Sequence, residues 1–284
     1  MEKIAVVTDT GSNISFAQAK ELGIYLLPLQ ITIDETTYQD TLEISTQDIY
    51  NELANGKMPK TSMAAYQKIY DLFEELKKDY DTIFAVPLTN GLSTNASTMQ
   101  SIARELEMNV HVIDMYATCA LEKHVAIWIK KLVDEHKSSE EILKIIQPAI
   151  DESNSLILVK NLQHLKRGGR LTPMAAALAG LLKIYPVLHI NKSTEGRIDV
   201  LNKVRTEKRA DAYAIDKIMD DIDIQHTHIY IIHSNFLEGA DHFKKCFIEK
   251  GVPEQNIHID YISSVIAVHT GLGCIAIQYI REEN

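Results

Sequence analysis

The sequence predicts an α/β protein with two units. We expect an N-terminal, Rossmann-like parallel sheet with helices on both faces, and a C-terminal mixed sheet with helices. Short apolar runs alternate with helix-like segments in the first half, which is typical of βαβ units. The runs are apolar throughout, as are strands that are buried on both faces. In the second half, two strand-like segments flank a polar, Gly-containing turn at 181–205, which predicts an antiparallel hairpin.

The first half reads as a regular series of strands and helices. Gly23 is a helix stop, and Pro28 interrupts the apolar run in which it lies. In order, the sequence predicts a strand at 3–10, a helix at 15–23, a β-leaning run at 24–34, helices at 45–56 and 64–80, a strand at 82–88, a helix from about Leu92, a strand at 109–115, and helices ending near His136 and Ser153.

Near residues 150–155 the regular alternation of strands and helices gives way to a pattern that includes an antiparallel hairpin. We therefore divide the chain into units 1–153 and 154–284. We expect the ligand between the two units, and a last helix able to pack back on the first. His269 is placed at a helix start, ahead of the apolar run 274–280. The other predicted segments are a strand, short helix and Gly-Gly-Arg loop within 155–173, the hairpin at 181–205, a helix at 206–222, strands at 227–234 and 256–262, and a helix at 239–251.

Composition narrows the class of protein. The 284 residues carry a net charge of −10, which disfavours binding to nucleic acid or to anionic lipid surfaces. Three cysteines without a CxxC argue against a disulfide framework, and no histidine pattern such as HExxH suggests a metal. The chain opens directly on a strand-like run, without a signal peptide or a membrane-length apolar run. We therefore expect a cytoplasmic protein with no metal and no cofactor.

Polar residues cluster where ligands bind in parallel sheets, beyond the carboxyl ends of strands. The candidate positions are 8–10, 60–62, 89–94 and Asp114, and each of them could equally serve as a helix cap. Considered together, Thr61 with Ser62 and Ser93 with Thr94 place hydroxyls at two predicted helix N-termini, which suits one anion. Because neither GxGxxG nor GxxxxGK[ST] occurs, a single carboxylate fits better than a pyrophosphate.

Two further residues are candidates for the same site. Arg170 ends the densest basic loop, KRGGR at 166–170, and could clamp an anion or a partner or lie in a solvated turn. His269 lies among glycines in AVHTGLGC and is either a ligand or a structural histidine. Ser93 could act as a nucleophile with His269 as its base, although GLSTN lacks the last glycine of GxSxG.

At these residues the sequence resembles the DegV family. VVTDT is similar to the opening T-D-S motif of the family, KTS to its threonine-serine motif and LTNGLSTNAS to its serine-rich loop. LQHLKRGGRLTP resembles the L-x-x-L-x-K-G-G-R-I signature. PVLHINKSTEGRIDVLNKVRT and AVHTGLG resemble the two later motifs. The resemblance spans nearly the whole chain in order. The sequence departs from the family pattern at Thr10, at 94–96, at Leu272 and in IDMYATCA.

The resemblance implies a carrier, not an enzyme. Family members bury one long-chain fatty acid, such as palmitate, between two domains and present its carboxylate to the catalytic subunit of bacterial fatty-acid kinase, a step in phospholipid metabolism. Transient membrane contact for lipid exchange fits that role. Carried over, Thr61 and Ser93 would bind the carboxylate, with Ser62 and Thr94 beside them, and Arg170 and His269 would lie near the head group. Arg205 would help to dock the kinase.

Two alternatives come from other classes of protein. The first is a serine hydrolase or acyl transferase that uses Ser93 and His269. The second is a non-catalytic scaffold with a vestigial pocket. The departure of the loop at 89–97 from the family pattern supports this alternative.

Overall fold

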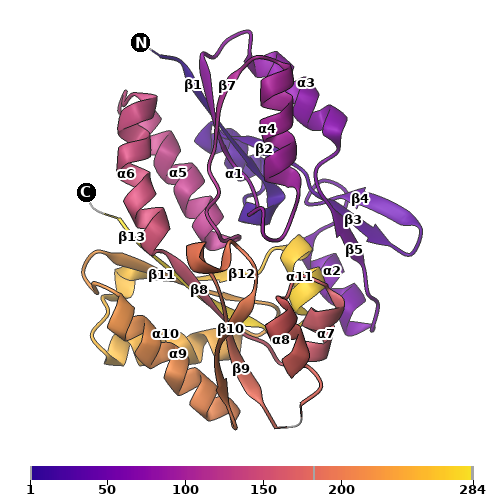
Figure 1. Cartoon of the computed structure of the whole chain (residues 1–284), viewed down its shortest axis with the longest axis vertical. Helices are drawn as coiled ribbons and strands as arrows, with labels where there is room; N and C mark the ends of the chain where they lie inside the picture. Colours follow the sequence, from indigo (N-terminus) through magenta and orange to yellow (C-terminus); the bar gives the residue numbers. More distant parts are fainter. Residues whose placement is uncertain (1, 182, 283–284) are drawn as a thin grey trace.

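Two large β-sheets, each with its own helices, form the computed structural model, which describes residues 2–181 and 183–282 (Figure 1). The first sheet has four strands in the order β2-β1-β6-β7, and every neighbouring pair is parallel. Its strands are β1 (Ile4–Asp9), β2 (Tyr25–Leu27), β6 (Thr82–Val86) and β7 (Asn109–Val112). The predicted parallel α/β unit is thus confirmed.

Helices cover both faces of this sheet. Val6 and Phe84 pack with α5 and α6 on one face, whereas Val7 and Ile83 pack with α3 and α4 on the other. Every residue of β1 and β6 is buried, which explains why these strands read as continuous apolar runs. The surrounding helices are α1 (Phe16–Leu22), α3 (Tyr66–Leu76), α4 (Asn95–Glu105), α5 (Ala120–Asp134) and α6 (Ser139–Glu152), with the 3₁₀ turn η1 (Thr10–Ser12) after β1.

A small antiparallel sheet in the order β4-β3-β5 was not predicted. Its strands are β3 (Gln30–Ile33), β4 (Thr36–Gln39) and β5 (Lys60–Ser62), and α2 (Thr46–Ala54) lies between β4 and β5 in the chain. Pro28 separates β2 from β3, as the interrupted run suggested. Thr61 and Ser62 therefore lie in a strand paired with β3, and the prediction that they occupy a helix N-terminus is wrong.

The second large sheet is mixed, as predicted, with six strands in the order β10-β9-β8-β13-β11-β12. β9 and β10 form the expected antiparallel hairpin, and β11 and β12 are parallel. The strands are β8 (Asn154–Leu158), β9 (Tyr185–Ile190), β10 (Asp199–Val204), β11 (Thr227–His233), β12 (Ile257–Tyr261) and β13 (Ile275–Arg281). Its segments also include α7 (Leu162–Arg167), α8 (Pro173–Leu178), α9 (Glu207–Asp221), α10 (Leu237–Glu249), α11 (Ser264–Thr270), η2 (Lys192–Thr194) and η3 (Glu254–Asn256).

The end of the chain differs from the sequence prediction. His269 lies in the last turn of α11, not at a helix start, and the apolar run after it is β13. Gly271 ends the helix with a positive φ of 74°, and Gly273, with a φ of 76°, lies in the turn before β13. Isoleucines then favour the extended conformation. In Figure 1, α11 lies beside α2 of the first unit, and the two helices are in contact.

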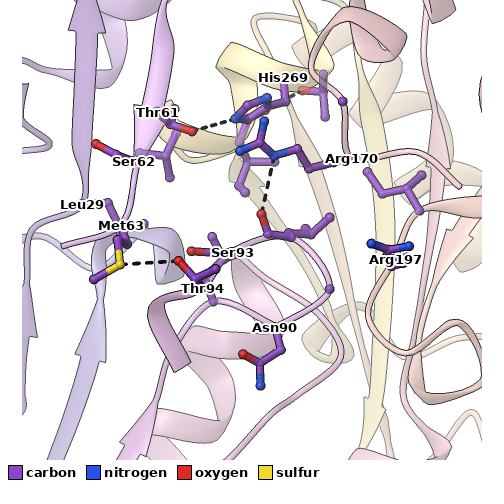
Figure 2. Close-up of a pocket in the computed structure, with 18 of the residues that line it drawn as sticks. Leu29, Thr61, Ser62, Met63, Asn90, Ser93, Thr94, Arg170, Arg197 and His269 are labelled. Atoms are coloured by element: carbon purple, nitrogen blue, oxygen red, sulfur yellow. Dashed lines mark hydrogen bonds between the residues drawn. The ribbon is translucent and has the colours of Figure 1, made fainter. Parts of the chain in front are cut away.

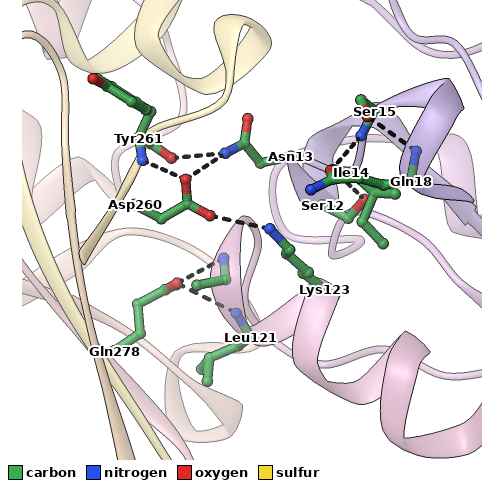
Figure 3. A network of polar contacts seen from close by, with 11 residues as sticks. Ser12, Asn13, Ile14, Ser15, Gln18, Leu121, Lys123, Asp260, Tyr261 and Gln278 are labelled. Carbon is green, nitrogen blue, oxygen red and sulfur yellow. Dashed lines mark hydrogen bonds and ion pairs between the residues drawn. The ribbon is translucent and has the colours of Figure 1, made fainter. Parts of the chain in front are cut away.

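Buried polar contacts join the two units. The side chain of Gln278 on β13 accepts hydrogen bonds from the backbone N–H groups of Ala120 and Leu121, at 3.1 and 3.4 Å, and donates to the carbonyl of Thr118 at 2.9 Å. Nearby, Asp260 on β12 pairs with Lys123 of α5 at 3.2 Å (Figure 3). The start of α5 is therefore fixed against the middle of the second sheet.

Candidate functional site

A cavity of about 440 Å³ lies where the first unit meets α11 and the loops of the second sheet (Figure 2). Six of the seven residues singled out from the sequence line this cavity: Thr61, Ser62, Ser93, Thr94, Arg170 and His269. Arg205 does not line it and lies exposed just after β10. The structure thus brings together residues that are up to 208 positions apart in the chain.

Thr61 and His269 are in direct contact. Thr61 Oγ1 lies 2.7 Å from Nε2 of His269 (Figure 2). His269 also makes a hydrogen bond to the backbone of Gly168, beside which its Nδ1 lies. We therefore assign the ring proton to Nδ1, so that Nε2 accepts the hydroxyl proton of Thr61.

His269 is held in its neutral form. Burial lowers its pKa to about 4, and the positive charge of Arg170 adds to this effect. An anion in the cavity would reverse this balance, because a negative charge close to the ring favours the imidazolium. A protonated Nε2 would also release the Thr61 hydroxyl to donate elsewhere.

Arg170 links two loops of the site. Its Nη1 donates to the carbonyl of Gly168 at 2.6 Å, and its Nε lies 3.5 Å from the carbonyl of Leu92. The Gly-Gly-Arg loop is thereby tied to the loop between β6 and α4. Since a guanidinium has five N–H donors, these two contacts leave donors available to a ligand.

Of the hydroxyls lining the cavity, that of Ser93 is the best placed to donate to a ligand. Ser93 Oγ accepts from the backbone N–H of Asn95 at 3.2 Å, and no acceptor for its own proton appears among the described residues. In contrast, the hydroxyl of Thr94 faces Met63 Sδ at 3.4 Å, and that of Ser62 donates to Gln30 at 3.1 Å. Thr94 is the N-cap of α4, but its side chain makes no capping hydrogen bond to the N–H groups of the first turn.

Two carboxylates fix the loop at 88–95 from behind. Asp9 accepts from the backbone N–H of Leu88 at 3.0 Å and from the side-chain amide of Asn95 at 2.6 Å. Asp114 accepts from the backbone N–H of Asn90 at 3.1 Å. The sequence suggested both aspartates as ligand positions, but neither lines the cavity, and they support the loop instead.

Two glycines allow the loops of the two units to meet. A Cβ on Gly91 would lie 2.1 Å from the carbonyl of Gly196, and a Cβ on Gly196, whose φ is +70°, would lie 2.0 Å from Thr89 Oγ1. This close approach brings Arg197 to the cavity wall, opposite Thr61 in Figure 2. Sequence reasoning missed Arg197, although the Glu-Gly-Arg turn in the predicted hairpin was a signal for it.

A second, smaller cavity of about 30 Å³ lies deeper in the molecule, between α11 and the second sheet. Apolar side chains form most of its wall. Leu92, Ile198, Ile266 and Thr270 line both cavities, so the polar site adjoins an apolar interior.

Within residues 2–181 and 183–282, no three His, Cys, Asp or Glu side chains are grouped to hold a metal ion. No helix in those same ranges combines the length and apolarity needed to cross a membrane.

Comparisons with known proteins agree on one family. A model for uncharacterised proteins of the DegV family matches residues 3–282. A DegV domain-containing protein of Halalkalibacterium halodurans is 30% identical over 289 residues, covering 100% of both chains. The crystal structure of a fatty acid binding DegV family protein from Streptococcus agalactiae has a TM-score of 0.91 at 29% identity, again over 100% of both chains. DegV from Bacillus subtilis, a fatty acid binding protein, has a TM-score of 0.86 at 27% identity, over 99% of this chain and 100% of that chain. The chain belongs to the DegV family.

Proposed function

We propose that this protein binds one long-chain fatty acid, such as palmitate, with its carboxylate in the 440 Å³ cavity and its tail in the interior between the units. The observation that carries the proposal is the convergence of Thr61, Ser93 and His269 on a cavity that adjoins an apolar interior. The fatty acid binding relatives from S. agalactiae and B. subtilis support the same ligand class.

The head of the ligand would meet a site suited to one negative charge. Ser93 supplies a hydroxyl proton, and Arg170 and Arg197 supply positive charge on the cavity wall. No carboxylate side chain lines this cavity among the described residues, so an incoming anion meets no like charge there. The contacts hold a carboxylate in place without attacking it.

The tail would supply most of the affinity. Burying about 15 methylenes at about 0.8 kcal/mol each gives about 12 kcal/mol before the cost of association. The inner cavity of about 30 Å³ is too small for such a tail, so binding requires it to widen. Leu92 and Ile266 line both cavities, and a change in their side-chain rotamers would join the two spaces.

The two alternative functions receive less support from the geometry. The hydrolase hypothesis needs a hydrogen bond between Ser93 and His269. No such bond occurs in the described structure, since His269 Nε2 bonds to Thr61. The scaffold hypothesis anticipates a collapsed or water-filled site. The outer cavity has about 440 Å³ and is not collapsed, whereas the inner cavity of about 30 Å³ must widen for a tail, and added palmitate tests whether it does.

Within this proposal the protein is a carrier that acts in the bacterial cytoplasm with a separate ATP-dependent kinase subunit, which phosphorylates the bound carboxylate. Brief membrane contact would allow lipid exchange. The exposed Arg205 is proposed to help dock the kinase. Arg205→Ala should leave palmitate affinity unchanged but slow acyl-phosphate formation by the cognate kinase, measured with purified subunits. The exposed Arg104→Ala is the control, and equal rates for both variants would refute the docking role.

Removing the Ser93 hydroxyl tests the head-group contact. Ser93→Ala should weaken palmitate binding by about 0.5–1.5 kcal/mol, or roughly two- to twelvefold in Kd, because one hydrogen bond to the carboxylate is lost. Isothermal titration measures the change. Ser101→Ala, which removes an exposed hydroxyl on α4, is the matched control. An unchanged Kd for Ser93→Ala would contradict the proposed placement of the carboxylate.

The pKa of His269 should report the ligand directly. In lipid-free protein this pKa is about 4, and the bound carboxylate should raise it because the anion stabilises the imidazolium. Since the pKa would be higher in the bound state, palmitate should also bind more tightly as the pH falls through that raised value. NMR titration of labelled imidazoles with and without palmitate measures both states. His189, on β9 and outside the cavity, should not respond. A His269 pKa that stays the same or falls would contradict the model of binding.

A further inference from the structure

Two carboxyl groups meet in the interior behind the loop at 88–95. Asp9 ends β1 and Glu122 lies in the first turn of α5, and both side chains are 0% exposed. None of the ion pairs found among the described residues includes either group. Two neighbouring carboxylates without a cation are too costly to keep ionised in such a place. One of them must therefore carry a proton.

The hydrogen bonds identify Asp9 as the ionised partner. Its Oδ1 accepts from Gly11 N–H at 2.8 Å, and its Oδ2 accepts from the N–H of Leu88 and the amide of Asn95. These three donors stabilise the negative charge on Asp9, so the charge is better placed there than on a neighbour with fewer donors.

Glu122 has the opposite surroundings. Its Oε1 lies 3.2 Å from Thr8 Oγ1, but that hydroxyl also donates to the carbonyl of Val86 at 2.7 Å, and one proton cannot serve both. Its Oε2 is buried and accepts no hydrogen bond. A Cβ on Gly11 would lie 2.7 Å from Asp9 Oδ1 and 3.1 Å from Glu122 Oε2, so both oxygens flank the same residue. If Glu122 Oε2 carries a proton, it needs an acceptor and not a donor, which explains why no donor faces it.

We propose that Glu122 is a neutral carboxylic acid that donates its proton to Asp9, and that Asp9, held in this way, is the positioning residue for the loop that carries Ser93. Glu122 thereby acts on the site through Asp9 and does not touch the ligand. The effect of this pair on ligand affinity rests on the proposed fatty acid binding, whereas the protonation of Glu122 does not.

The pair of Asp9 and Glu122 fixes the position of the loop on both sides of Ser93. Leu88 lies five residues before Ser93 and Asn95 two residues after it, and both donate to the same oxygen of Asp9. A shift of that carboxylate moves both ends of the loop together. Because an O–H···O hydrogen bond needs a separation of about 2.5–3.0 Å and a nearly linear angle, a small displacement of Ser93 costs affinity. Burial raises the pKa of Glu122 well above its usual range, and the charge of Asp9 raises it further, in agreement with a neutral acid.

The protonation is tested first, in lipid-free protein. Infrared spectra at pH 8 should contain the carbonyl band of a buried protonated carboxylic acid. That band should disappear in Glu122→Gln, which has no acid proton. Absence of the band, or its persistence in Glu122→Gln, would overturn the assignment of the proton. This result is independent of lipid binding.

Positioning is tested by palmitate titration of folded variants. Glu122→Leu removes the donor and should weaken binding about five- to tenfold. Glu122→Gln keeps a donor toward Asp9 and should restore most of that loss, a rescue that mere space-filling would not give. Asn154→Ala removes a buried amide in the second sheet and serves as the stability control, expected to bind within about twofold of wild type.

A second variant covers the case in which Glu122→Leu does not fold. Asn95→Ala removes one tie to Asp9 and should also weaken binding severalfold. Wild-type affinity in a folded Glu122→Leu, or in Asn95→Ala, would overturn the positioning role. If wild-type protein itself binds no palmitate, the proposed function fails, and the infrared band still decides where the proton lies.

Discussion

The carboxylate of Asp9 is the constraint on which the candidate site depends. It lies at the end of the first strand of the parallel sheet, fully buried, and it accepts hydrogen bonds from N–H groups of its own turn, of the start of the loop after β6 and of the start of α4. An ionised group in such a place requires these donors. The sheet therefore fixes the loop through one charge, and the loop in turn presents the Ser93 hydroxyl to the cavity.

The candidate site has a polar region and an apolar region. Neutral donors and two guanidinium groups surround the place for a carboxylate, whereas the interior beyond Leu92 and Ile266 is apolar. Residues of both units line each region, and Gln278 and the pair of Asp260 with Lys123 hold the two units together. A ligand with a charged head and a long apolar tail matches this arrangement better than a small polar metabolite, for which the apolar interior would have no use.

Local features of the sequence predicted most of the fold. The features that were not predicted, β5 and Arg197, depend on contacts between distant segments. The helix at 15–23 and its stop at Gly23 are read from adjacent residues. The three residues of β5 are too short and polar to read as a strand, because their conformation comes from pairing with β3. Sequence motifs predicted the six cavity residues but not Arg197. Arg197 reaches the cavity because Gly91 and Gly196 lie in contact, and these two glycines are 105 positions apart in the chain (196 − 91).

Native mass spectrometry of the purified protein, followed by denaturing extraction, shows whether the cavity holds a fatty acid. We expect one fatty acid per chain, bound in the native spectrum and released intact on denaturation, with palmitate taken up by protein stripped of lipid. A protein that carries no fatty acid and also does not bind added palmitate would rule out fatty acid binding. The cavity between Ser93 and His269 would then hold a different ligand.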